Sequence, residues 1–98
     1  MIYVIATLNT KPGQAMEVRR AALPLISATL AETGCISYDL NADIGDENRL
    51  VFVERWEGRE HLEAHFATAH IAAFGAAVKD LLEGQNVEII EPKNVEVN

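Results

Sequence analysis

The chain has 98 residues, 49% of them hydrophobic, and it carries a formal net charge of −7. This length fits one small domain, and so small a domain gains stability when copies associate. The acidic balance, with no cluster of arginine or lysine, argues against nucleic acid and anionic membranes as partners. We expect a single domain over residues 1–98, with a tail from about residue 93.

The first part of the chain predicts a strand followed by one long helix. Residues 2–8 are mostly β-branched or aromatic, which is typical of a strand. Pro12 suits the first position of a helix, and apolar side chains recur at helical spacing over residues 15–30. Pro24 interrupts this pattern, so we expect a kink there rather than two helices. Gly34 suits the left-handed position that ends a helix.

The middle of the chain predicts a pair of antiparallel strands. Residues 35–40 and residues 49–57 alternate between apolar and polar side chains, and residues 43–48 form a polar turn between them. Two alternating segments joined by such a turn indicate a hairpin. One face of the second strand carries Phe52, Glu54 and Trp56, and the other face carries Val51, Val53 and Arg55.

The last part of the chain predicts two short helices and a final strand. The first helix covers about residues 58–67, and Thr68 can cap a second helix whose apolar stripe ends at Leu81. Residues 84–86 interrupt the pattern, and residues 87–90 read as the last strand. The order β-α-β-β-α-β predicts an α+β, ferredoxin-like fold with a four-stranded antiparallel sheet.

The predicted sheet has one face covered by helices and one face left open. Val51 and Val53 would lie on the open face, and exposed apolar side chains of this kind are normally covered. Packing of two copies sheet to sheet is the simplest way to cover them. We therefore expect a homodimer formed through the open face of the sheet.

The cysteine content and the N-terminus bear on the compartment. Cys35 is the one cysteine, so no intrachain disulfide can form, which suits a reducing cytoplasm. The first residues lack the basic region and cleavage site of a signal peptide. No apolar run approaches the roughly 20 residues of a membrane-spanning helix. We expect a cytoplasmic protein.

Three side chains are candidates for chemistry where the sheet meets the helices. Asn9 ends the first strand, Trp56 ends the third, and His65 lies on the helix that follows. Trp56 alone is more often a core residue than a ligand contact. Glu54 shares a strand face with Trp56, so its carboxylate is either paired or placed in a pocket. Its possible partners are Arg49, Arg59 and His65.

A metal interpretation of the histidines is weak. His61 and His65 are four residues apart and share a helix face, as zinc ligands can. A zinc site needs a third ligand, and Glu63 does not stand next to the first histidine as in metalloproteases. Chance pairing on a surface helix is more common, so we expect no metal.

Several segments together resemble the antibiotic biosynthesis monooxygenase family. They are the stretches Gly34 to Leu40, Phe52 to Glu57 and Leu62 to Phe66, His70-Ile71 before Phe74, and Lys11-Pro12-Gly13. The resemblance covers nearly the whole chain. It implies a dimeric α+β barrel with a pocket in each subunit between sheet and helices. It also implies oxidation of a small aromatic or quinol-type substrate by molecular oxygen, with no other cofactor.

The resemblance also implies roles for individual residues. Relatives that degrade haem use an asparagine on the first strand, a tryptophan on the third and a histidine on the next helix. Asn9, Trp56 and His65 could match this set, although His70 is also available. In that case His65 would remove a phenolic proton, Asn9 would hydrogen-bond the substrate oxygen, and the ring would lie against Trp56. The further candidates for substrate contact are Tyr38, Phe52, Glu54, His61, His70 and Phe74.

Two other classes of function stay open. A non-oxidative, isomerase-like enzyme would need basic groups for a small polar substrate, and the nearby candidates are Arg49, Arg55 and Arg59. A non-catalytic dimeric binding module would be favoured by an occluded pocket in which Glu54 and His65 pair only with each other. Haem degradation fits less well, because haem propionates want basic partners and this chain is acidic.

Overall fold

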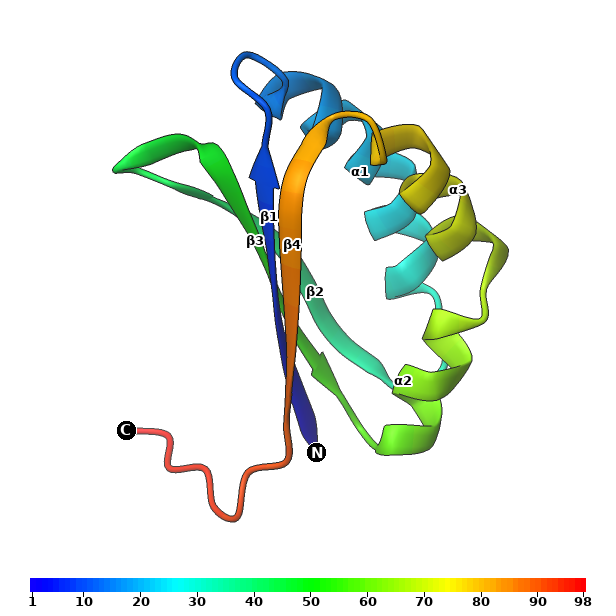
Figure 1. The fold of residues 1–98 in the computed structure, drawn as a ribbon. Helices are drawn as coiled ribbons and strands as arrows, with labels where there is room; N and C mark the ends of the chain where they lie inside the picture. The colour runs from blue at the N-terminus through cyan, green and yellow to red at the C-terminus, as the bar shows by residue number, and fades with distance from the viewer.

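The computed structural model describes residues 1–98 as one antiparallel sheet with helices on one side (Figure 1). The elements in chain order are β1 (Ile2–Thr10), α1 (Ala15–Leu30), β2 (Cys35–Asp43), β3 (Asp46–Trp56), α2 (Arg59–Phe66), α3 (Ala69–Val78) and β4 (Leu82–Ile90). The strands lie in the order β2-β3-β1-β4. This confirms the predicted ferredoxin-like α+β fold, in which α2 and α3 together take the place of the second helix.

The pairing of β1 with β3 decides which side chains meet the helices. The pairing runs from Ile2 opposite Trp56 to Asn9 opposite Arg49. Even-numbered residues of both strands point toward the helices, and the core residues Val4, Leu8, Leu50 and Phe52 are among them. Odd-numbered residues therefore point to the open face. The faces predicted for β3 are confirmed.

Helix α1 covers the sheet with one apolar stripe. Its buried residues are Val18, Ala22, Leu25 and Thr29, at the spacing of three and four that one helix face requires. The helix is continuous through Pro24, as predicted, and Pro24 itself is exposed. The helix begins at Ala15 and not at Pro12, because the turn at residues 11–13 precedes it and Gly13 has a φ of 78°.

Two strands are longer than the alternation predicts. The hairpin loop is only Ile44-Gly45, because Asp43 and Asp46 already pair with each other. Strand β4 begins at Leu82 and includes residues 84–86, which were expected to interrupt the pattern before a strand at residues 87–90. The reason is tertiary: β1 offers a pairing partner along its whole length, so Gly84 pairs opposite Asn9.

The face of the sheet opposite the helices carries apolar side chains without cover. Tyr3, Ile5 and Val51 are half-buried there, and Val53 is exposed. Residues 91–98 form no strand or helix, and they run to the same side of the sheet (Figure 1). None of the three helices combines the length and hydrophobicity needed to cross a bilayer.

Replacement of Gly34 by alanine is expected to destabilise the fold by more than replacement of Gly13. Both glycines have a positive φ, 83° at Gly34 and 78° at Gly13, which costs an alanine about 1 kcal/mol. A Cβ at Gly34 would also overlap the ring of His61, whereas a Cβ at Gly13 would meet nothing within 4 Å. Urea unfolding of both variants measures the difference.

The double variant Gly34→Ala/His61→Ala tests the assigned cause. It should recover the part of the destabilisation that comes from overlap with the His61 ring, and leave the cost of the backbone conformation. Equal destabilisation in Gly34→Ala and Gly13→Ala would contradict this account of the close approach.

Candidate active site

A cavity of about 240 Å³ lies between the sheet and the helices. Its walls are mainly aliphatic and aromatic, and come from β1, β2, β3, β4 and all three helices. The polar side chains that line it are Tyr38, Glu54, His65 and Gln85. No arginine or lysine is among the lining residues. The cavity is therefore suited to an uncharged, largely apolar molecule that forms a few directed hydrogen bonds.

Glu54 is a buried carboxyl group on this cavity. It and Trp56 point to the same face of β3, and the Trp56 Nε1–H donates a hydrogen bond of 2.9 Å to Glu54 Oε1. Burial raises the pKa of Glu54 to about 7, against the opposing effect of that hydrogen bond. A carboxyl group with this pKa can hold or release a proton near neutral pH. Of the two alternatives predicted for Glu54, the structure confirms the pocket, and its hydrogen-bond partner is Trp56 rather than His65 or an arginine.

His65 is a buried imidazole held by two aromatic neighbours. Its side chain is 1% exposed, and its ring centroid lies 4.8 Å from that of Trp56 and 5.3 Å from that of Tyr38. Burial lowers the pKa of His65, and its hydrogen bond with Glu32 acts in the opposite direction. Burial also raises the pKa of Tyr38, so its hydroxyl keeps its proton.

Glu32 fixes the orientation of His65. Its Oε2 lies 2.6 Å from His65 Nδ1, so an ionised Glu32 places the imidazole proton on Nδ1. The Nε2 atom is then left as a hydrogen-bond acceptor, on a residue that lines the cavity. Glu32 is not predictable from the sequence, because a glutamate in the turn after α1 has no local signal linking it to a histidine 33 residues away.

His70 shares the same carboxylate oxygen. Its Nε2 lies 2.7 Å from Glu32 Oε2, and its side chain is partly exposed. Ligand atoms of Glu32, His65 and His70 lie within 4.8 Å of one another, so these three residues are the group that could hold a divalent cation. Both nitrogens are already at hydrogen-bonding distance from one oxygen, so a cation would have to replace both hydrogen bonds.

Asn9 does not lie at this site, which corrects the prediction from sequence. It pairs with Arg49, whereas Trp56 pairs with Ile2 at the other end of β1. At roughly 3.3 Å per residue the two ends lie about 23 Å apart. Asn9 is also odd-numbered and exposed, so it belongs to the open face. The residues of β1 that line the cavity are Val4, Ala6 and Leu8.

The other predicted residues divide into two groups. Those that line the cavity with His65 are Tyr38, Phe52, Glu54 and Phe74. Trp56, His61 and His70 do not line it. Trp56 is fully buried behind the cavity wall, where it contacts His65 and Glu54. His61 covers Gly34, and its Nε2 lies 3.6 Å from Glu60 Oε1. Direct contact of substrate with Trp56, His61 or His70 is therefore not supported.

Known proteins share both the sequence and the fold. The Escherichia coli protein named "Probable quinol monooxygenase YgiN" is 37% identical over 94% of this chain and 98% of its own. The structure of Rv0793 from Mycobacterium tuberculosis matches with a TM-score of 0.89 at 30% identity, over 98% of each chain. PA3566 from Pseudomonas aeruginosa matches with a TM-score of 0.87 at 29% identity, over 95% of this chain and 94% of its own.

The family assignment covers most of the residues that build the site, and all of the candidate catalytic ones. The family model described as "Antibiotic biosynthesis monooxygenase" matches residues 1–77. That range includes Glu32, Glu54, Trp56 and His65, and it leaves out only β4 and the tail among the larger features. The chain belongs to the antibiotic biosynthesis monooxygenase family.

Proposed function

We propose that the protein is a cofactor-independent monooxygenase that oxidises a small quinol-type aromatic molecule with O₂. The observation that supports this most is the His65 imidazole, whose Nε2 is unpaired while Glu32 holds Nδ1. The name of the Escherichia coli relative supports the substrate class. The cavity of about 240 Å³ is smaller than the roughly 300–1,000 Å³ of drug-sized ligand sites, which favours a small ring system.

The first step is removal of a phenolic proton by His65. The O–H bond breaks, its electron pair stays on the oxygen, and the proton moves to His65 Nε2. Glu32 stabilises the resulting imidazolium through the hydrogen bond to Nδ1. Because burial lowers the pKa of His65, the base is neutral and ready at neutral pH.

The second stage transfers oxygen to the ring. The electron-rich anion gives one electron to O₂, and the resulting radical pair combines into a carbon-bound peroxide. The peroxide anion takes back the proton held on His65 Nε2 and becomes a hydroperoxide. The ring carbon then loses its hydrogen as a proton to the neutral His65 Nε2, the C–H electron pair forms the carbonyl bond, and the O–O bond breaks so that the outer oxygen leaves as hydroxide and becomes water on protonation. Glu54 holds a proton near neutral pH and lines the same cavity, so it can protonate the leaving oxygen.

The two rival classes lose their expected support in this geometry. The arginines that a charged substrate would require lie outside the cavity: Arg49 and Arg55 are on the open face, and Arg59 binds Glu63. An occluded binding module would require Glu54 and His65 to pair with each other. They do not, because Glu54 binds Trp56 and His65 binds Glu32. Both residues instead line a common cavity.

Oxygen uptake with a panel of quinols and anthrones tests the proposed function. Chelator-treated protein should consume O₂ with at least one substrate, and should release water rather than hydrogen peroxide. Incorporation of one atom of labelled oxygen into the product would establish the monooxygenase stoichiometry. Loss of all activity after chelation, restored by a divalent metal, would instead assign Glu32, His65 and His70 to a metal centre.

We also propose that two copies pair through the open face of the sheet. Replacement of Val53 by aspartate is expected to convert a dimer into monomers. Asp39→Asn is the control on the same face of the sheet. Val53 is 38% exposed at a position where a partner sheet would bury it, and a buried unpaired carboxylate costs several kcal/mol. Light scattering across a concentration series measures the mass, and a monomeric wild-type protein would contradict the proposal.

A further inference from the structure

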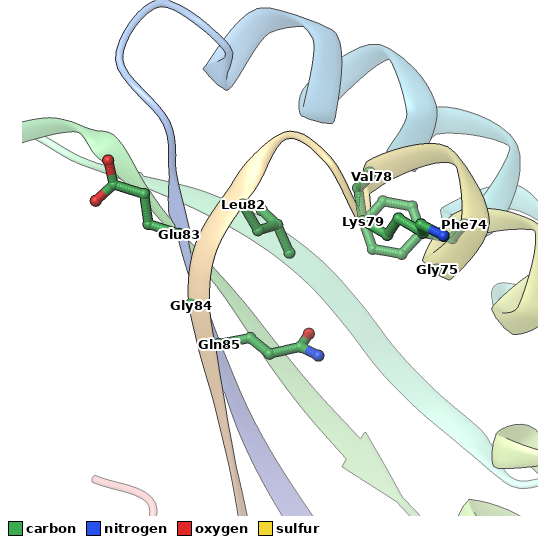
Figure 2. Close-up of a pocket in the computed structure, with 8 residues that line it drawn as sticks. All are labelled: Phe74, Gly75, Val78, Lys79, Leu82, Glu83, Gly84 and Gln85. Carbon is green, nitrogen blue, oxygen red and sulfur yellow. The ribbon is translucent and has the colours of Figure 1, made fainter.

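A second hollow of about 300 Å³ adjoins the cavity, between α3 and β4 (Figure 2). We call it the outer groove, and it is lined by Phe74, Gly75, Val78, Lys79, Leu82, Glu83, Gly84 and Gln85. Phe74, Gly75 and Gln85 also line the cavity, so the two spaces meet at these three residues. The predicted catalytic residues are not among the residues lining the groove.

Gly75 lies where the groove meets the cavity, and the fold does not require a glycine at this position. It lies inside α3, where glycine costs about 1 kcal/mol relative to alanine, and its φ is not positive. A Cβ built on Gly75 would meet no atom within 4 Å. No packing contact therefore demands a glycine here. A larger side chain would extend into the open space that joins the groove to the cavity.

The groove differs from the cavity in chemistry. Phe74, Val78 and Leu82 give it an apolar floor, and the Gln85 amide points from β4 toward α3 (Figure 2). The Glu83 carboxylate points away to the other side of β4 in the same view. Lys79 is the one cationic residue that lines either space. The groove therefore suits an apolar chain that ends in an acidic or hydrogen-bond-accepting group.

We propose that the outer groove is a second subsite, which holds a chain attached to the aromatic ring, and that Gly75 determines whether such a chain can pass. The ring would occupy the cavity beside His65 and Glu54. The chain would leave between Gly75 and Gln85, and its polar end would reach Lys79. The nature of the ring rests on the proposed function, whereas the subsite can be tested by binding alone.

Ligand binding without oxygen tests the subsite independently of turnover. Trp56 is the one tryptophan of the chain, and it contacts His65 and Glu54, so its fluorescence reports on the cavity. The probes are methylhydroquinone, hexylhydroquinone, and a hydroquinone whose six-carbon chain ends in a carboxylate. The wild-type protein should bind both long-chain probes at least about tenfold more tightly than methylhydroquinone, because the chain is buried.

The variants distinguish a block to passage of the chain past residue 75 from a general loss of ligand binding. Gly75→Leu should remove the advantage of the long chain, and Gly75→Ala should reduce it while raising the thermal midpoint. Ala76→Leu adds the same side chain at an exposed neighbouring position outside both spaces, and should keep the advantage. Lys79→Gln should lower affinity for the carboxylate probe selectively.

The outcomes distinguish the two proposals. Equal affinity of the wild-type protein for short and long probes, or an undiminished chain-length advantage in Gly75→Leu and Gly75→Ala, would overturn the subsite. Chain-length discrimination without oxygen uptake by any quinol would overturn the proposed oxygenase function and keep the subsite. Oxygen uptake without chain-length discrimination would overturn the subsite and keep the proposed oxygenase function.

Discussion

Replacing His65 by glutamine is expected to lower kcat/KM for quinol oxidation by about 10²–10⁴-fold. His65 lines the cavity, and its Nε2 is free of a hydrogen-bond partner while Glu32 holds Nδ1, so we assign it as the group that accepts a phenolic proton. Glutamine keeps a polar side chain of similar reach but cannot serve as a base near neutral pH. Oxygen-electrode kinetics with the best substrate of the panel, at several pH values, measure the effect.

The pH profile adds a second readout for the same role. Burial lowers the pKa of His65, so wild-type kcat/KM should fall on the acid side, where the imidazole becomes protonated. An alkaline fall in kcat is expected as the pH rises through about 7, where Glu54 loses the proton that it gives to the leaving oxygen. The Glu32→Gln variant loses the charge that stabilises the imidazolium, which should shift this acid limb to lower pH and reduce kcat. A merely structural Glu32 would leave the position of the limb unchanged.

Two controls keep the result interpretable. His61→Gln changes a histidine on the same helix that does not line the cavity, and it should retain nearly full activity. Asn9→Ala should also retain activity, because Asn9 lies on the open face at the far end of β1. A His65→Gln protein that folds normally and keeps activity within twofold of wild type would remove His65 from the mechanism.

The sequence carried enough information to place half of the site. Strand alternation put Phe52, Glu54 and Trp56 on one face of β3, and the paired strands keep that assignment because a register slip would turn the apolar set toward solvent. The same rule applied to β1 would have placed Asn9 on the opposite face from Val4 and Leu8. The position of Asn9 at the end of a strand was weaker evidence for its place in the site than the alternation of side chains along that strand.

The remaining half depends on contacts that no local pattern encodes. Glu32 meets His65 and His70 only because the turn after α1 comes close to α2 and α3 in the folded chain. Its partners are 33 and 38 residues distant. Strand β4 likewise extends through Gly84 because β1 provides the hydrogen-bonding partner, despite weak strand propensity there.

Glu54→Gln is expected to stabilise the fold at pH 8 by up to about 3 kcal/mol and to leave stability nearly unchanged at pH 4.5. Burial raises the pKa of Glu54 from 4.5 to about 7, so between these values the folded state binds a proton that the unfolded state has lost. The stability due to that proton is fully present below pH 4.5 and is lost as the pH rises through about 7. The upper limit of about 3 kcal/mol follows from this pKa shift, because each pKa unit corresponds to about 1.36 kcal/mol.

Glutamine is the matched replacement because its side-chain oxygen can still accept the hydrogen bond of the Trp56 Nε1–H, while the charge is removed. Glu57→Gln, at an exposed position just after β3, should change stability by less than about 0.5 kcal/mol at both pH values. Urea unfolding of the three proteins at pH 4.5 and pH 8 gives the comparison.

Measuring the activity of the same variant tests whether the buried carboxyl group serves the reaction or only the fold. If Glu54 protonates the leaving oxygen, Glu54→Gln should gain stability at pH 8 and lose turnover, since glutamine has no acidic proton to give. A gain in stability with full activity would make Glu54 a structural acceptor for Trp56 only. A loss of stability at pH 8 would contradict the raised pKa, because it would mean that the fold depends on the ionised carboxylate.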